Sequence, residues 1–84
     1  MRVIPSSRSL RKAKKLREPR ASLLRGALRR FAAEPQDPLL HTHRLEGDLS
    51  GYWSFSVDDD LRVLFRWDGE ELFLVNIGTH DEVY

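Results

Sequence analysis

Residues 53–78 read WSFSVDDDLRVLFRWDGEELFLVNIG, and along most of this stretch every second side chain is apolar. An alternation with a period of two is typical of β-strands that bury one face. Three aspartates at positions 58–60 interrupt the first alternating run. Asp68-Gly69, a dipeptide that favours a two-residue hairpin turn, interrupts the second. The stretch therefore predicts three antiparallel strands joined by two short turns.

The two turns fix an expected register. A three-residue first turn pairs Phe55 with Val63, and a turn at Asp68-Gly69 pairs Phe65 with Leu72. Residues directly opposed in a ladder share a face. One face is therefore expected to be apolar and to pack against helices: Trp53, Phe55, Val57, Leu61, Val63, Phe65, Trp67, Leu72 and Leu74.

The opposite face of the same strands is expected to be more polar. Arg66 falls opposite Glu71 in this register, which predicts a cross-strand ion pair. Arg62 falls opposite Ser56 and has no carboxylate across the ladder. An arginine so placed is either an anion-binding residue or an ordinary solvated side chain, and the pattern alone leaves both interpretations open.

The first part of the chain carries helix signals. Residues 1–5 predict a short strand, and Ser6 and Ser7 are suitable N-caps for a helix that ends near Leu16. Pro19 suits the first turn of a second helix, whose apolar stripe would be Leu23, Leu24, Ala27, Leu28 and Phe31. The sequence thus predicts a single α+β domain over residues 1–84. Its order would be strand, helix, helix and then three or four strands, in a mainly antiparallel sheet with both helices on one face.

Charge is divided unevenly along the chain. Residues 1–33 hold eleven Lys or Arg and one acidic residue, a net charge of +10. Residues 34–84 hold three Arg and twelve acidic residues, a net charge of −9. Such a split predicts one surface that binds a polyanion and another with a different task, unless the basic helices are merely solvated. The chain has no cysteine, which excludes disulfides and thiolate chemistry, and it has no apolar run long enough to cross a membrane.

Three histidines, His41, His43 and His80, are the side chains that titrate near neutral pH. Their spacing matches no metal site, and the chain has no glycine-rich phosphate loop. Two histidines, an arginine and a tyrosine on one sheet face would suit RNA cleavage through the ribose 2′-hydroxyl. That reaction needs a base, an acid and a cation, and it needs no metal ion. Each histidine taken singly also fits an ordinary surface position.

Several short motifs in the second half of the chain resemble one superfamily. They are HRLEG at 43–47, LSGYWSF at 49–55, DLRV at 60–63 and IGTHDEVY at 77–84. Together they resemble the RelE/ParE superfamily of bacterial toxins, and most of all its YafQ-like branch. The resemblance implies a RelE-like fold and the toxin of a type II toxin–antitoxin system. It also implies a metal-independent endoribonuclease, an mRNA interferase that cleaves messenger RNA on the ribosome.

The resemblance implies roles for particular residues. His43 and His80 match family histidines and would serve as base and acid, with His80 favoured as the acid. Arg62 would stabilise the phosphorane, and Asp60 would orient a histidine or the RNA. Tyr84 would stack on a base or steady the scissile phosphate.

One position departs from the family pattern. A second-strand histidine of the YafQ-like branch falls at Ser56, which cannot act as an acid or a base. Either the two remaining histidines suffice for catalysis or activity is reduced.

The basic first helix would bind ribosomal RNA through salt-sensitive phosphate contacts. The residues expected to bind RNA are Arg11, Lys12, Lys14, Lys15, Ser54 and Ser56.

The expected partners also follow from the resemblance. They are the ribosome with its mRNA, a cognate antitoxin that folds as it wraps the toxin, and operator DNA reached through that antitoxin. No cofactor and no membrane are expected, and the location would be the cytoplasm.

Three rival functions are weighed against this one. A ParE-like toxin would inhibit DNA gyrase by binding, although it would have no need of His43, His80 and Tyr84. A catalytically weakened toxin would act by binding alone, which Ser56 favours. A free-standing nucleic-acid-binding domain would use the basic helices, although the acidic second half argues against it.

Overall fold

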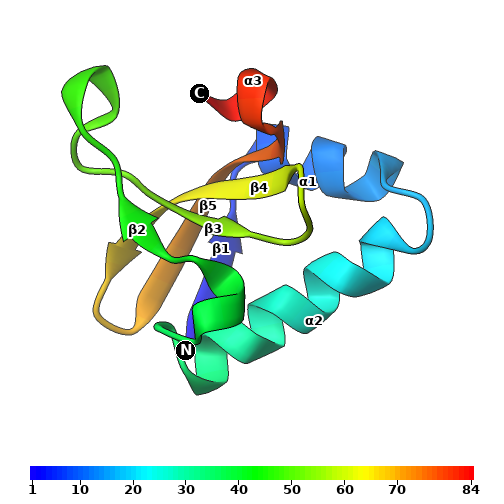
Figure 1. Cartoon of the computed structure of the whole chain (residues 1–84), viewed down its shortest axis with the longest axis horizontal. Coiled ribbons are helices and arrows are strands. Elements are labelled where there is room, and N and C mark those ends of the chain that lie inside the picture. The colour runs from blue at the N-terminus through cyan, green and yellow to red at the C-terminus, as the bar shows by residue number, and fades with distance from the viewer.

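The computed structural model describes residues 1–84 and arranges them as a five-stranded sheet with α1 and α2 on one side and α3 on the other (Figure 1). The strands are β1 (Arg2–Pro5), β2 (His43–Arg44), β3 (Trp53–Ser56), β4 (Leu61–Asp68) and β5 (Glu71–Thr79). The helices are α1 (Ser7–Lys15), α2 (Arg20–Ala33) and α3 (His80–Val83), with 3₁₀ turns η1 (Pro38–Leu40) and η2 (Gly47–Leu49). The strand order is β1-β5-β4-β3-β2; β1 is parallel to β5 and all other neighbours are antiparallel. This is the α+β arrangement predicted from the sequence.

Local signals account for the two long helices. The side chain of Ser6 accepts a hydrogen bond from the N–H of Ser9, which makes Ser6 the N-cap of α1. Pro19 is the N-cap residue of α2, directly before its first helical residue. The start of α1 confirms the prediction, and α2 begins one residue later than predicted, with Pro19 just outside its first turn. No helix combines the length and the apolar character that crossing a membrane requires.

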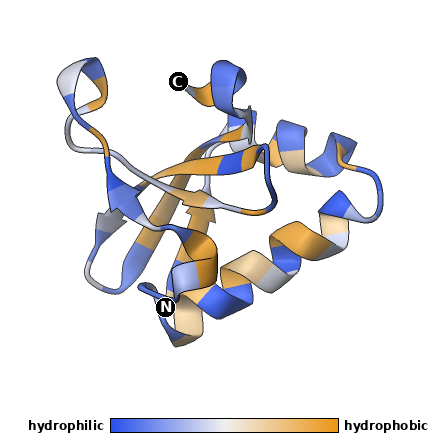
Figure 2. Cartoon of the chain, in the orientation of Figure 1, coloured by the Kyte–Doolittle hydropathy of each residue, from blue (hydrophilic) through white to orange (hydrophobic).

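The core lies between α2 and the inner face of the sheet, which we define as the face toward α1 and α2. Phe31 is fully buried, and its ring centroid lies 5.4 Å from that of Phe55 and 5.2 Å from that of Phe65. Figure 2 shows apolar residues along the strands and on α2, and hydrophilic residues at the β4–β5 turn. Leu23 was predicted to face the sheet but is 42% exposed, because it lies about 100° around the helix from buried Leu24.

The β3–β4 hairpin has the predicted register. Phe55 pairs with Val63, and Ser56 pairs with Arg62. Because opposed residues share a face, Phe55 and Val63 enter the core. Ser56 and Arg62 lie on the other side of the sheet, which we call the outer face.

The β4–β5 register was predicted wrongly, by two residues. Asp68 pairs with Glu71, so the two central residues of the turn follow Asp68, and Gly69 is the first of them with φ +55°. Glycine adopts a positive φ without strain, and a type II′ turn requires it at this position. A shift of two residues leaves each side chain on its expected face, so Phe65 and Leu74 still lie in the core.

The shift removes one predicted contact. Arg66 pairs with Phe73, and the ion pair predicted between Arg66 and Glu71 does not form. Glu71 instead forms an ion pair with Arg2 of β1, at 3.5 Å. Arg66 is therefore left exposed on the outer face without a carboxylate partner.

A β-bulge changes the phase of β5. The β4–β5 ladder shifts between Leu64 and Phe65, so Val75 has no partner of its own. One extra residue reverses the alternation along a strand. Ile77 therefore turns into the core, and Asn76 lies on the outer face beneath α3.

Candidate functional site

The outer face carries two rows of side chains that the sequence singles out. His43 on β2 lies opposite Ser54 on β3, and Ser54 lies opposite Leu64 on β4. In the next row, Ser56 lies opposite Arg62. Since opposed residues share a face, His43, the two serines and Arg62 all lie on the same side of the sheet.

The short helix α3 brings the C-terminal residues over this face. The hydroxyl of Tyr84 donates a hydrogen bond to Oγ of Ser54. The ring of His80 meets the ring of Tyr84 edge-on, with centroids 4.6 Å apart. Ser54, expected to bind RNA, is fully buried, so its hydroxyl contacts Tyr84 and not solvent. Tyr84 therefore contacts both Ser54 and the ring of His80, and His43 is the neighbour of Ser54 across the β2–β3 ladder.

Specific contacts hold α3 in place. The N–H of Thr79 donates to Oε1 of Glu82 at 2.7 Å as part of a capping box, and Nδ2 of Asn76 donates to the carbonyl of Glu82 at 3.4 Å. Gly78 makes room for this helix, since a Cβ there would lie 2.8 Å from Oε1 of Glu82 and 3.2 Å from Nζ of Lys12. The N–H of Thr79, followed by its hydroxyl and Lys12, lowers the pKa of Glu82 below its ordinary value. The carboxylate that closes the cap is therefore ionised at neutral pH.

Backbone contacts orient the ring of His43. Its Nδ1 lies 2.8 Å from the carbonyl oxygen of His41. Because a carbonyl only accepts hydrogen bonds, Nδ1 carries the proton, and the neutral ring presents the lone pair of Nε2. A histidine in this tautomer can act as a base. His80 has its Nδ1 3.3 Å from the carboxylate of Asp81, which leaves Nε2 of His80 free.

The β3–β4 turn holds Arg62. Its Nη1 donates to the carbonyls of Asp58 at 2.7 Å and Leu61 at 3.3 Å, and its Nη2 donates to the carbonyl of Asp59 at 3.0 Å. These bonds use three of the five N–H groups of the guanidinium and leave two for a ligand. No carboxylate forms an ion pair with Arg62. Arg62 is thus an oriented cation with two N–H groups free to donate hydrogen bonds.

Asp58 fixes the conformation of this turn. Its Oδ1 accepts hydrogen bonds from the N–H groups of Leu61 and Asp60, and its Oδ2 accepts one from Nε of Arg20 at 2.9 Å. Burial acts to raise the pKa of Asp58, but the two N–H groups and Arg20 outweigh it and lower the pKa. Asp60, expected in the catalytic group, is exposed in this turn, and its carboxylate forms no ion pair with either histidine.

The basic residues of α1 adjoin α3. Lys14 is exposed and lies outside this junction, where the other four cations of α1 gather. A hollow of about 270 Å³ at this junction is lined by Arg8, Arg11, Lys12, Lys15, Asn76 and Glu82. Positive charge from α1 is therefore continuous with the helix that carries His80 and Tyr84.

A larger groove, of about 680 Å³, extends along the outer face toward β1. Tyr52 and Phe73 offer half-buried aromatic rings in it, and Arg66 adds an exposed cation. Aromatic rings beside a cation can stack bases and hold a phosphate, so the groove can accept single-stranded nucleic acid.

Sequence reasoning assigned no role to three residues that shape the site: His41, Asn76 and Glu82. The spacing Thr79-x-x-Glu82 is a visible capping-box signal for α3. The bulge that turns Asn76 toward α3 has no sequence signal of its own. No three His, Cys, Asp or Glu side chains lie close enough together to hold a metal ion.

Comparisons with known proteins bear on both fold and family. Residues 6–84 match the family model described as a bacterial toxin of type II toxin–antitoxin system, YafQ. Toxin YoeB of Streptomyces coelicolor is 42% identical over 36 residues, and this match spans 43% of the chain and 43% of that relative's length. YafQ from E. coli strain BL21(DE3) has a TM-score of 0.80 at 18% identity, over 100% of this chain and 99% of that one. The YoeB–YefM complex from Staphylococcus aureus has a TM-score of 0.80 at 13% identity, over 95% of this chain and 97% of that one. At these identities the two structures show a shared fold.

Proposed function

The chain belongs to the YafQ family of type II toxin–antitoxin toxins, and we propose that it is an endoribonuclease that cleaves mRNA without a metal ion. The observation that carries this proposal is that Tyr84 contacts both Ser54 and His80 over the sheet face on which His43 lies opposite Ser54, with Arg62 in the next row of that face. A base, an acid and a cation are the groups needed to transfer a phosphodiester from its 5′-oxygen to the ribose 2′-oxygen. One domain, residues 1–84, would contain the whole activity.

His43 acts as the base in this mechanism, because its Nδ1–H is bound to a carbonyl and its Nε2 is free to take a proton. Nε2 removes the proton of the 2′-hydroxyl, and the 2′-oxygen attacks the phosphorus to form a new P–O bond. The bond from phosphorus to the 5′-oxygen breaks, and protonated His80 gives its proton to that oxygen. The products are a 2′,3′-cyclic phosphate and a 5′-hydroxyl.

The remaining residues bind and orient the RNA. Arg62 stabilises the phosphorane with the two N–H groups that the turn leaves free. Tyr84 contacts the ring of His80 and steadies the scissile phosphate or an adjacent base. Asp60 orients the RNA from the same turn that holds Arg62. Ser56 is half-buried opposite Arg62, and its hydroxyl forms a hydrogen bond with the RNA.

The ribosome is the proposed setting for cleavage. The groove of the outer face would receive mRNA, while the exposed cations of α1 would contact phosphates of ribosomal RNA. This division is supported by the position of the α1 hollow, which lies beside α3 but outside the groove.

A cognate antitoxin is the proposed protein partner. The S. aureus protein of the same fold is found in a YoeB–YefM toxin–antitoxin complex. An antitoxin of this chain would fold as it binds, and it would carry the pair to operator DNA. An mRNA substrate on the ribosome would place the protein in the cytoplasm.

The purified protein tests the proposal when it is added to a cell-free translation reaction and, separately, to a gyrase supercoiling assay. We expect translation to stop with mRNA cut into fragments, and supercoiling to continue. Gyrase inhibition with intact mRNA would identify a ParE-like toxin instead. Translation arrest with intact mRNA would identify a weakened toxin that acts by binding.

A further inference from the structure

A pocket at one end of the outer face contains a histidine whose side chain has no role in the mechanism above. The pocket measures about 300 Å³ and lies between the η1–β2 junction and the β3–β4 turn. His41, Ser56 and Arg62 line it together with two aspartates of the turn.

The pocket brings His41 beside two residues of the sheet. Ser56 pairs with Arg62 across the β3–β4 ladder, in the row next to Ser54 and His43. His41 lies outside β2, which begins at His43, and it lines the same pocket as Ser56 and Arg62.

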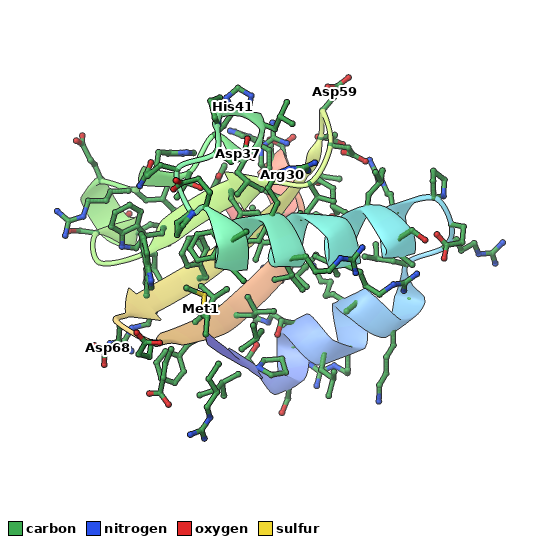
Figure 3. The ribbon with its side chains drawn as sticks, turned by 90° about the horizontal axis from the view of Figure 1, so that it is seen from below. Met1, Arg30, Asp37, His41, Asp59 and Asp68 are labelled. Atoms are coloured by element: carbon green, nitrogen blue, oxygen red, sulfur yellow. The ribbon has the colours of Figure 1, made fainter.

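The segment around His41 is anchored on both sides. Leu40 is 1% exposed, and the hydroxyl of Thr42 donates to a backbone carbonyl at 2.6 Å. Asp37, the N-cap of η1, forms an ion pair at 3.5 Å with Arg30 of α2, and Figure 3 shows His41 just beyond this pair. The position of His41 is thus set by the fold.

The backbone conformation of His41 does not require a histidine side chain. The residue has φ 50° in the left-handed region, at the C-cap of η1. Glycine and asparagine adopt this conformation more readily than histidine. The carbonyl that orients His43 would be offered by any residue at this position. The side chain is therefore available for another task, and Figure 3 shows it pointing outward on the same side as Asp59.

The pocket favours an anion in spite of its two aspartates. The carboxylate of Asp58 is already bound by an arginine and by two backbone N–H groups. Asp59 lies at the tip of the turn, and Figure 3 shows its side chain pointing away from the molecule. Arg62 keeps two free N–H groups, and the hydroxyl of Ser56 and the ring of His41 lie beside it.

We propose that His41 is a third histidine of the site and that, with Ser56, it binds the same phosphate of the RNA that the free N–H groups of Arg62 contact. This proposal rests on the proposed ribonuclease function and extends it to the subsite of that phosphate. Rows two residues apart along a strand are separated by about 7 Å, so the pocket adjoins the row of His43 without coinciding with it. A protonated ring nitrogen of His41 donates a hydrogen bond to a phosphate oxygen.

The test measures the binding of an RNA that cannot be cleaved. A short RNA with methylated 2′-hydroxyls is titrated onto the wild type, His41→Asn and His41→Gly, and NMR shifts give the Kd. Both substitutions remove the imidazole and suit the left-handed backbone, so the Tm should be unchanged or slightly raised. Binding by both variants should weaken by about threefold to tenfold, the range for one lost hydrogen bond.

Arg62→Lys, alone and combined with His41→Asn, tests whether the two residues share one phosphate. If they do, the double variant should lose less affinity than the product of the two single losses. His41→Asn that binds like the wild type overturns the proposal and leaves the proposed function standing, because cleavage of ordinary mRNA is measured separately. Binding that falls only with the fraction of folded protein also overturns it. A wild type that neither binds nor cuts RNA overturns the function and the subsite together.

Discussion

Helix α1 and the outer face of the sheet both present polar side chains, but only those of the outer face are oriented by hydrogen bonds. On α1, Arg11, Lys14 and Lys15 are exposed and form no ion pair. On the outer face, His43 and Arg62 are oriented by hydrogen bonds to backbone carbonyls. Mobile cations suit binding to any phosphate, whereas oriented groups suit chemistry at one atom. We infer that α1 supplies affinity for ribosomal RNA and that the outer face supplies the reaction.

His80→Ala should separate the two regions most clearly. Loss of the acid should lower the rate of mRNA cleavage by about 10²–10⁴. Ribosome association, assigned to α1, should be unchanged. Cleavage is measured in a reconstituted translation reaction, and association by cosedimentation. Glu70→Ala, an exposed change at the β4–β5 turn, is the control. Undiminished cleavage by His80→Ala would remove His80 from the mechanism.

Arg62→Ala should have the next largest effect. Without the cation on the phosphorane, cleavage should slow by about 10²–10³. Stability should fall by about 1 kcal/mol, because the hydrogen bonds to the exposed turn are lost. Arg62→Lys keeps the charge but not the planar guanidinium, so its cleavage rate should lie between those of the wild type and Arg62→Ala. A large drop in Tm with normal cleavage per folded molecule would make Arg62 a structural residue.

Charge reversal of Arg11, Lys14 and Lys15 to Glu tests the other side of the comparison. Ribosome binding should weaken, and the slope of log K against log salt should become shallower by up to about 3. Lys12 is left unchanged because it lies beside Glu82 of α3. Cleavage of free RNA at high protein concentration should persist. Unchanged ribosome binding would mean that these three cations of α1 are only solvated, or bind an acidic antitoxin segment.

Asp58→Asn should have the smallest effect, on stability at low pH. The folded pKa of Asp58 is lowered from the ordinary value of 3.8. Its ionised form therefore stabilises the fold fully above pH 3.8, and this contribution is lost as pH falls through the lower folded pKa. Urea unfolding gives the free energy of unfolding at neutral pH and near pH 3. Between these two pH values it should fall less for Asp58→Asn than for the wild type. An equal fall in the two proteins would mean that Asp58 does not fix the turn.

The two hairpins show how far the sequence predicts the sheet. At the β3–β4 turn, the three aspartates leave one register that keeps Phe55 and Val63 on the same face, and that register is correct. At the β4–β5 turn, Gly69 suits either of two positions, and both keep the apolar side chains inside. Period-two patterning therefore gives faces reliably but not partners. The mistaken partner is why Arg66 was expected to bind Glu71.

The candidate site was predictable in its residues more than in its contacts. His43, Arg62 and Tyr84 lie on one face because strand alternation and the chain end place them there. The burial of Ser54 depends on α3, a four-residue helix whose capping box is its only sequence signal. The place of His41 follows from how the η1–β2 junction packs near the β3–β4 turn, a contact for which the sequence has no signal.

The ends of the cleaved RNA test the central claim most directly. The wild-type protein cuts ribosome-bound mRNA, and mass spectrometry identifies the new termini. The account predicts a 5′-hydroxyl on one fragment and a 2′,3′-cyclic phosphate or its 3′-phosphate on the other. It also predicts no cleavage where the 2′-hydroxyl is methylated. A 5′-phosphate, or cleavage at a methylated position, would contradict attack by the 2′-oxygen and the roles assigned to His43 and His80.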